Sequence, residues 1–395
     1  MKYCILIIDG AAGLPLPGRG SRTCLEIADT PNLDILARQG KVGLVSNVPP
    51  GMEPSSACAC MSLMGYDPEV YYSGRAAIEA LSMDIPIAEG EVVFRCNLVT
   101  VDNGIMSSYS AGHISTGESE ELIEALNEKL GTEGIRFYNG INYRHICKLR
   151  GASDTLQAVC TPPHDISNQA VSEFLPHGEG SELLRKLMDD SREVLLDHPV
   201  NQKRQAEGKL PANMIWLFWG SGKLLAVPSF KQLRGLNAAM TSGVDLLQGL
   251  SKMASIDVLD IPGVTDGLDN DFKAQVEGAL DALERYDLVI IHVEAPDEAA
   301  HGGDIDGKVE AIQKVDTEIL GRIVQWNSDT LRVMALPDHP TPISTQTHST
   351  EPVPFVLWGD GFTSNGASHF SEAEAKKTNL YIEHGYDTIC RLIGD

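Results

Sequence analysis

The chain is poor in basic residues. It has 31 lysines and arginines against 55 aspartates and glutamates, which gives its 395 residues a formal net charge of -24. Such an acidic surface repels nucleic acids and anionic lipids, so we expect neither as a partner. A small anionic substrate would therefore need a local pocket of arginine, lysine or metal.

The chain also lacks long apolar runs. No run approaches 18 residues, and Met1 leads directly into a strand pattern with no signal peptide before it. The eight cysteines are scattered, and the Cys58-x-Cys60 pair is a weak zinc signal because no second pair accompanies it. We therefore expect reduced thiols, no membrane span and a cytoplasmic location.

Short apolar runs rich in β-branched residues alternate with helical patterns over much of the chain. They lie at residues 3–9, 256–261, 288–293, 331–336 and 353–357. This alternation predicts an α/β fold with a doubly wound, mostly parallel sheet.

The pattern changes after residue 72. Strand-like segments at 92–101 and 135–149 accompany amphipathic segments at 120–130 and 181–196, and a polar connector follows at 197–211. At the apolar run 214–220 we expect the first pattern, strands alternating with helices, to resume. We predict a sheet domain from residues 1–72 and 212–395, interrupted by an inserted α+β domain at 73–211.

One motif combines a carboxylate and an imidazole just after a predicted strand. Asp297 and His301 are four residues apart, so a helix starting there would place both on one face. The pair could hold a divalent metal, although an acidic first helical turn in solvent is also common.

Other polar side chains follow other predicted strands. In open α/β sheets the ligand site lies beyond the carboxyl ends of the strands. The set contains oxygen and nitrogen donors without thiolate, which suits Mn²⁺ or Zn²⁺, with Mg²⁺ as a third candidate. It is large enough for two metals about 3.5–4 Å apart. The candidate ligands are Asp9, Ser56, Asp297, His301, Asp338, His339 and His348.

A serine pair begins a short predicted helix that ends near Gly65. Ser55 or Ser56 could simply cap the helix, or could act as a nucleophile, since a helix N-terminus and a metal favour an alkoxide and an incoming phosphate.

The inserted domain carries basic and polar residues near strand ends and turns. A single arginine commonly has a surface role, but several together could hold a carboxylate and a phosphate. These residues are Arg75, Arg95, Asn97, His113, Arg144, His164 and Asp165.

The order of the seven candidate metal ligands along the chain resembles that of the alkaline phosphatase superfamily. More narrowly, the whole chain resembles the archaeal-type cofactor-independent phosphoglycerate mutases. The motifs that carry the resemblance are Gly65-Tyr66-Asp67-Pro68, Phe94-Arg95-Cys96-Asn97, Pro162-Pro163-His164-Asp165-Ile166, Pro211-Ala212-Asn213-x-Ile215-Trp216 and Asp297-Glu298-Ala299-x-His301.

The resemblance implies two divalent metal ions and no 2,3-bisphosphoglycerate. Ser56 would accept the phosphoryl group and return it to the other hydroxyl of the same glycerate. The inserted domain would be a lid that binds the phosphorylated hydroxy acid. One metal would be held by Asp297, His301 and His348, and the other by Asp9, Asp338, His339 and the Ser56 oxygen.

Two departures from the family pattern leave alternatives open. The usual Gly-Ser-Asp around the nucleophile is Ser55-Ser56-Ala57 here, so Ser55 is a second candidate. The usual Gly-Arg-Gly-Pro is replaced by Gly74-Arg75-Ala76-Ala77. Both changes touch the expected substrate pocket.

The expected function is interconversion of 2-phosphoglycerate and 3-phosphoglycerate. The segment 108–116 also resembles a bacterial subgroup associated with homoserine phosphorylation. A phosphotransferase acting on such an alcohol, a phosphomonoesterase and a non-catalytic metal-binding protein are the alternatives. The transferase would need a donor site, and the segment 220–223 lacks the glycine and serine or threonine of a Walker A loop.

Overall fold

The computed structural model describes residues 1–326 and 330–394. The chain forms two compact units, one from Met1–Tyr72 and Ala226–Asp395, the other from Ser73–Leu225. We call these unit 1 and unit 2.

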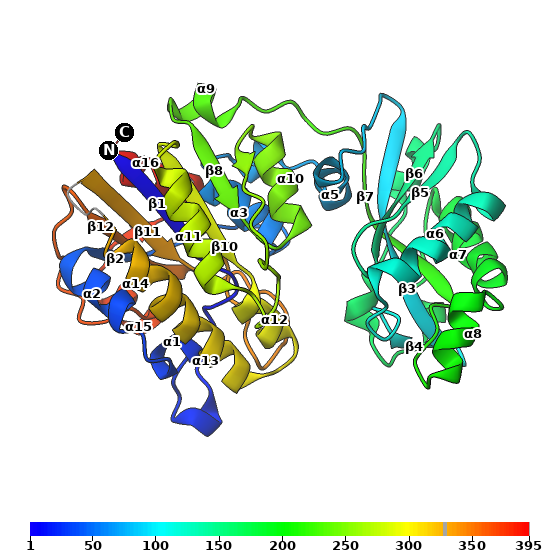
Figure 1. Ribbon diagram of the computed structural model, residues 1–395, viewed down its shortest axis with the longest axis horizontal. Helices are drawn as coiled ribbons and strands as arrows, with labels where there is room; N and C mark the ends of the chain where they lie inside the picture. Colours follow the sequence, from blue (N-terminus) through cyan, green and yellow to red (C-terminus); the bar gives the residue numbers. More distant parts are fainter. Residues whose placement is uncertain (327–329, 395) are drawn as a thin grey trace. The chain divides into compact units, whose positions relative to one another are not determined.

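Unit 1 is built on an eight-stranded sheet (Figure 1). The strands are β1 (Lys2–Ile8), β2 (Lys41–Val45), β8 (Ala238–Thr241), β9 (Asp257–Val258), β10 (Leu288–Val293), β11 (Leu331–Leu336), β12 (Val353–Gly359) and β13 (Tyr381–Ile382). Their order is β13-β2-β12-β11-β1-β10-β8-β9. Neighbours are parallel except at β12, which is antiparallel to both β11 and β2. The predicted α/β class with a mostly parallel sheet is confirmed.

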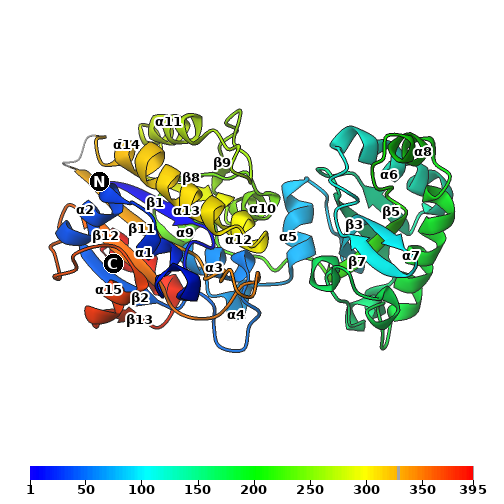
Figure 2. The same ribbon diagram turned by 90° about the horizontal axis from the view of Figure 1, so that it is seen from below.

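Helices cover both faces of this sheet. The helix running through α13, η5 and α14 lies with α11 on one side, and α3 lies on the other (Figure 2). None of the helices in residues 1–326 and 330–394 is long and apolar enough to cross a bilayer. The unit 1 helices are α1 (Cys24–Ile27), α2 (Pro31–Gln39), α3 (Ser56–Leu63), α4 (Pro68–Tyr71), α9 (Phe230–Arg234), α10 (Asp245–Met253), α11 (Phe272–Leu283), α12 (Ala295–His301), α13 (Ile305–Lys314), the π-helical η5 (Val315–Leu320), α14 (Gly321–Ile323), α15 (Glu372–Lys377) and α16 (Thr388–Ile393).

The centre of the unit 1 sheet determines where polar side chains emerge. β1 is almost entirely apolar and buried, as a strand covered on both faces must be. It pairs in parallel with β10 on one side and β11 on the other. The carboxyl ends of these three strands therefore meet at one edge.

Unit 2 contains a five-stranded antiparallel sheet. Its strands are β3 (Glu91–Asp102), β4 (Ile105–Ser108), β5 (Ile135–Tyr138), β6 (Arg144–Arg150) and β7 (Met214–Ser221), in the order β4-β3-β6-β5, and β7 also pairs with β3. The helices are α5 (Arg75–Ser82), α6 (Thr116–Leu130), α7 (Ser181–Leu195) and α8 (Pro199–Ala206), with short 3₁₀ turns η2 (Ser153–Gln157), η3 (Pro163–Ile166) and η4 (Val171–Glu173).

The two faces of the unit 2 sheet are covered differently. Helix α7 packs on β7, and α6 packs on α7. Helix α5 packs on the opposite face (Figure 2), where its alanines contact Val93 and Ile146. That face also carries Arg95, Asn97 and the ring of Phe218.

Two predictions about the second half of unit 2 are wrong. The strand at 214–220 was expected to resume the large sheet, but β7 pairs with β3, so unit 2 runs to Leu225 and does not end at 211. A buried apolar run has the same pattern in either sheet, so periodicity does not identify its partner. The expected connector at 197–211 also contains helix α8.

Candidate metal centre

The seven candidate ligands meet at the carboxyl edge of the unit 1 sheet. Asp9 directly follows β1, and Asp338 and His339 follow β11 after Pro337. Helix α12, which carries Asp297 and His301, follows β10. His348 lies in the segment between β11 and β12, and Ser56 is the first residue of α3. The side chains therefore come from distant parts of the sequence.

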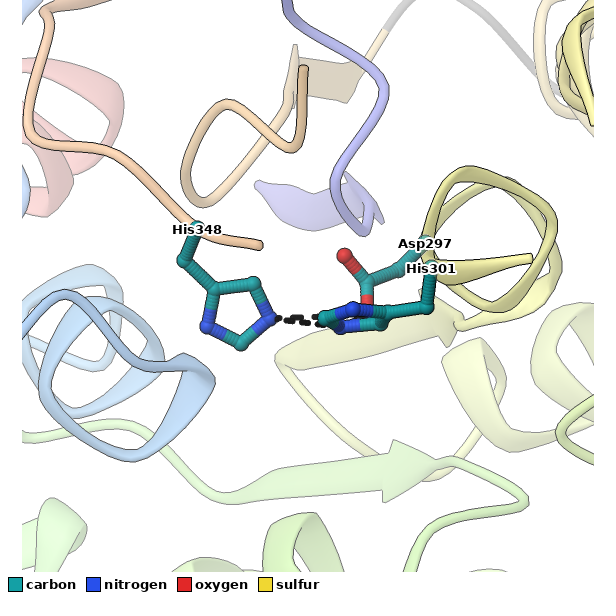
Figure 3. Close-up of side chains that lie close together, drawn as sticks. All are labelled: Asp297, His301 and His348. Carbon is teal, nitrogen blue, oxygen red and sulfur yellow. Dashed lines mark hydrogen bonds and ion pairs between the residues drawn. The ribbon is translucent and has the colours of Figure 1, made fainter. Parts of the chain in front are cut away.

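Asp297, His301 and His348 form the first cluster (Figure 3). The Nε2 atoms of the two imidazoles are 3.0 Å apart. They lie 3.0 Å and 3.6 Å from the same Asp297 oxygen, Oδ2. Three donor atoms from two segments thus face one point, which is the arrangement that a shared cation needs.

Hydrogen bonds around this cluster orient the imidazoles. Nδ1 of His301 donates to the carbonyl oxygen of Gln346 at 2.8 Å, and Nδ1 of His348 donates to that of Pro54 at 3.1 Å. A carbonyl only accepts, so each Nδ1 carries a proton. In the neutral imidazole the Nε2 lone pair then faces the cluster, as in metal sites whose second ring nitrogen is held by the protein.

His301 and Asp297 of this cluster have shifted pKa values. Burial opposes charge on His301, but the hydrogen bond and charge of Asp297 prevail and raise its pKa to about 9. Burial also opposes ionisation of Asp297, but the two histidines, first His348, hold its pKa well below its usual value. These shifts favour a protonated His301 beside an ionised Asp297.

Metal binding to this cluster should release a proton from His301. Its pKa of about 9 means that it is protonated at neutral pH, whereas only a neutral imidazole binds metal. Affinity for Mn²⁺ should rise about tenfold per pH unit below this pKa and level off above it. Calorimetry in buffers of different ionisation enthalpy counts the proton, with His301→Ala as the control. Binding at neutral pH without proton release would contradict the assignment.

Asp9, Asp338 and His339 form the second cluster, and Ser56 lies beside it. Nε2 of His339 lies 3.2 Å from Asp338 Oδ2, 3.6 Å from Asp9 Oδ1 and 3.1 Å from Ser56 Oγ. All four side chains are buried.

The two clusters are adjacent. The rings of His339 and His348 are stacked with their centroids 4.0 Å apart. Thr341 Oγ1 joins the clusters, because it donates to Asp297 Oδ1 at 2.5 Å and lies 3.3 Å from His339 Nδ1. With its one proton donated to a carboxylate, this hydroxyl accepts from His339 Nδ1, so the Nε2 lone pair of His339 faces Ser56.

The second cluster has an excess of negative charge. Burial, followed by the charges of nearby carboxylates led by Asp338, raises the pKa of Asp9 well above its usual value. Among the described residues, Asp9 Oδ1 and Glu294 Oε2 are buried without a hydrogen-bond partner. Buried carboxylates of this kind are stabilised by cations. The oxygen and nitrogen donors of both clusters therefore fit a pair of divalent metals.

The structure distinguishes the two candidate serines. Ser55 is the N-cap of α3, and its Oγ accepts from the backbone N–H of Cys58 at 3.4 Å. Ser56 is the next residue, and its hydroxyl faces His339. Ser55 therefore caps the helix, whereas the hydroxyl of Ser56 lies beside the second cluster.

Two residues beside Asp9 were missed by the sequence reasoning. His292 Nε2 lies 2.7 Å from Asp9 Oδ2, and its Nδ1 lies 3.0 Å from Ser242 Oγ. Glu294 lies near both, and it forms with Asp9 and His292 a third group of closely placed donors. His292 lies in β10 and Glu294 directly follows that strand, so their spacing of two, just before Asp297, could have indicated that both face the site.

The predicted substrate residues lie in unit 2, and several are joined. Glu79 of α5 binds Arg75 Nε at 2.8 Å and also pairs with Arg95 Nη1. Arg95 Nε donates to Asn97 Oδ1 at 3.1 Å, and Arg144 is opposite Asn97 in the β3–β6 register. These groups share one face of the sheet.

The remaining candidates in unit 2 lie on turns. His164 and Asp165 are exposed on η3, with His164 Nε2 3.6 Å from Asp165 Oδ1. The His164 ring lies 5.6 Å from that of Trp219, near the joined arginines. His113 is exposed on the turn before α6.

Comparison with known proteins supports one family. The family model described as 2,3-bisphosphoglycerate-independent phosphoglycerate mutase matches residues 37–201. A relative of that name from Methanothrix thermoacetophila is 46% identical over 396 residues, covering 100% of both chains. A relative from Geobacter sulfurreducens, named as a probable enzyme of this kind, is 43% identical and 98% of each chain is covered.

Solved structures agree with the sequence relatives. A protein from Pyrococcus horikoshii has a TM-score of 0.82 at 26% identity, covering 100% of this chain and 96% of that one. The cofactor-independent phosphoglycerate mutase from Thermoplasma acidophilum has a TM-score of 0.63 at 26% identity, covering 100% of this chain and 99% of that one. The fold and the full-length sequence similarity together show that the chain belongs to the family of 2,3-bisphosphoglycerate-independent phosphoglycerate mutases.

Proposed function

We propose that this protein interconverts 2-phosphoglycerate and 3-phosphoglycerate through a phosphorylated Ser56, with two divalent cations and without 2,3-bisphosphoglycerate. The observation that carries the proposal is the Ser56 hydroxyl, 3.1 Å from His339 Nε2 at the junction of two adjacent donor clusters. The names of the full-length relatives supply the substrate.

The proposed reaction has two transfers. The Ser56 hydroxyl loses its proton and its oxygen forms a bond to phosphorus, while the bond from phosphorus to the glycerate oxygen breaks and that oxygen takes up a proton. The other glycerate hydroxyl then loses its proton and bonds to the phosphorus, while the bond from phosphorus to the Ser56 oxygen breaks and the serine hydroxyl is protonated again. The N-terminal N–H groups of α3 favour the phosphoryl charge beside Ser56.

The residues that would hold the cations are those of the two clusters. One ion would be bound by Asp297, His301 and His348, and the other by Asp9, Asp338, His339 and the Ser56 oxygen. The ions would polarise the phosphoryl oxygens and lower the pKa of the serine hydroxyl.

The composition of the clusters and of the chain supports two finer proposals. Three imidazoles favour Mn²⁺ or Zn²⁺, with Mg²⁺ as the third candidate. The eight cysteines, all in the described part of the chain, are free thiols, which supports a cytoplasmic location.

We also propose that unit 2 is the substrate-binding lid. Its sheet face carries Arg95 and Asn97, and α5 begins with Arg75. A guanidinium matches both a carboxylate and a phosphate. A lid would exclude water, which matters because hydrolysis of the phosphorylated serine competes with its return to glycerate.

An assay on 3-phosphoglycerate tests the proposal. Protein loaded with Mn²⁺ should form 2-phosphoglycerate without added 2,3-bisphosphoglycerate, and chelation should stop the reaction. Incubation of the same sample with homoserine and ATP tests the phosphotransferase alternative. Release of phosphate from small esters tests the phosphomonoesterase alternative. Phosphorylation of homoserine without conversion of 3-phosphoglycerate would show that the proposal is wrong.

A further inference from the structure

Trp219 has an unusual backbone conformation. Its φ is +49°, in the left-handed region that bulky residues rarely adopt. It lies where the register between β3 and β7 shifts. Arg95 is opposite Phe218, but Val93, two residues away on β3, is opposite Ser221, three residues away on β7. β7 therefore contains one extra residue, a β-bulge. Such conformations are kept where the surrounding structure requires them, often at functional sites.

The bulge changes the direction of the Trp219 side chain. Successive side chains in a regular strand point to opposite faces, which would separate Phe218 from Trp219. Here their ring centroids are only 4.6 Å apart. The indole therefore lies on the face of the sheet that carries Arg95 and is covered by α5.

Arg75 lies on the indole face. Its Cζ is 4.3 Å from the Trp219 ring centroid, within the range of a cation–π interaction. The contact depends on the close approach of α5 to β7. A Cβ on Gly74 would lie 2.3 Å from Ser221 Oγ, so the glycine permits Arg75 to begin its helix directly over the bulge.

Both Glu79 and Trp219 thus hold the guanidinium of Arg75. Glu79, one helical turn later, binds its Nε at 2.8 Å. Trp219 supports its plane without adding negative charge. A second carboxylate at this position would fix the side chain equally well but would neutralise it. An aromatic ring orients the cation and keeps its charge for an anion.

We infer that Trp219 is a positioning residue, whose ring and strained bulge hold Arg75 in the orientation that binds the anionic substrate. The inference rests on the proposed function, in which Arg75 is a substrate-binding group. It adds a residue that acts through the arginine and does not itself take part in the phosphoryl transfer. Loss of the ring should therefore affect binding of phosphoglycerate more than the turnover of bound substrate.

Two substitutions of Trp219 in the metal-loaded full chain test this. Trp219→Leu should raise KM for 3-phosphoglycerate on the order of tenfold with kcat changed about twofold or less. Trp219→Phe keeps an aromatic face, so it should restore KM to within about threefold of wild type. Thermal melting compares the folding of both variants. Equal KM values for Leu and Phe variants that are both folded would overturn the inference.

A double-mutant cycle separates positioning from general packing. Arg75→Lys keeps the charge but loses the planar fork. Its effect on the dissociation constant of 3-phosphoglycerate, measured by calorimetry, should be several-fold smaller in the Trp219→Leu background than in wild type. Fully additive effects would overturn the inference. This binding measurement does not depend on turnover, so wild-type protein without mutase activity would refute only the proposed function.

Discussion

Replacing Ser56 by alanine should abolish phosphoryl transfer while the metal ions stay bound. The substitution removes the hydroxyl that faces His339 Nε2 at 3.1 Å and leaves the six carboxylate and imidazole donors in place. We expect turnover of 3-phosphoglycerate to fall by a factor on the order of 10⁴ or more, as for other nucleophile deletions. Steady-state assays give the turnover, elemental analysis gives the metal content, and mass spectrometry detects phosphoserine in wild type.

Ser55→Ala is the matched control. It removes one hydroxyl from the neighbouring residue and breaks the cap at Cys58. Loss of an N-cap should cost about 1 kcal/mol of stability, with turnover largely retained. If Ser56→Ala keeps near-wild-type turnover and Ser55→Ala does not, Ser55 is the nucleophile.

The second large effect is expected from Asp297→Asn. Both Nε2 atoms of the first cluster face the Asp297 Oδ2 oxygen, and the amide lacks the negative charge that a cation requires. Metal content should fall from two ions per chain toward one. Turnover should fall by a factor on the order of 10³ or more, because one side of the phosphoryl group loses its counter-charge.

Glu298→Gln gives the same change of charge at the next position of α12. The Glu298 side chain is exposed, whereas Asp297 is buried. We expect two ions per chain and wild-type turnover. Equal metal loss in both variants would indicate that general charge, and not ligation by Asp297, holds the ion.

The centre of the fold was predictable because its strands are long and apolar. β1, β10 and β11 are buried on both faces, and a polar residue follows each of them within two positions. β8 was missed, because four residues carry little periodicity, and of the run predicted at 256–261 only Asp257–Val258 form a strand, β9. β7 was recognised as a strand but placed in the wrong sheet, since its partner β3 is set by tertiary contacts that the local pattern does not contain.

The candidate site was predictable as a location more than as a set of interactions. The seven proposed ligands lie together because parallel strand ends share an edge, and their roles as ligands stay predictions. His292 was missed because it lies inside β10, whose apolar pattern already looked complete, and Glu294 because it lies between that strand and helix α12. The pairing of Glu79 with two arginines joins a helix to a strand sixteen residues away, and no local pattern indicates it.

The sheet order also has a consequence for biosynthesis. Tyr3 of β1 pairs with Leu288 and Arg332, so β1 cannot pair with either neighbour until more than 200 further residues have been translated. Ser73–Leu225 is continuous and can fold during this interval. Until then β1 is an apolar segment with two unpaired edges, which are the features that favour aggregation during synthesis.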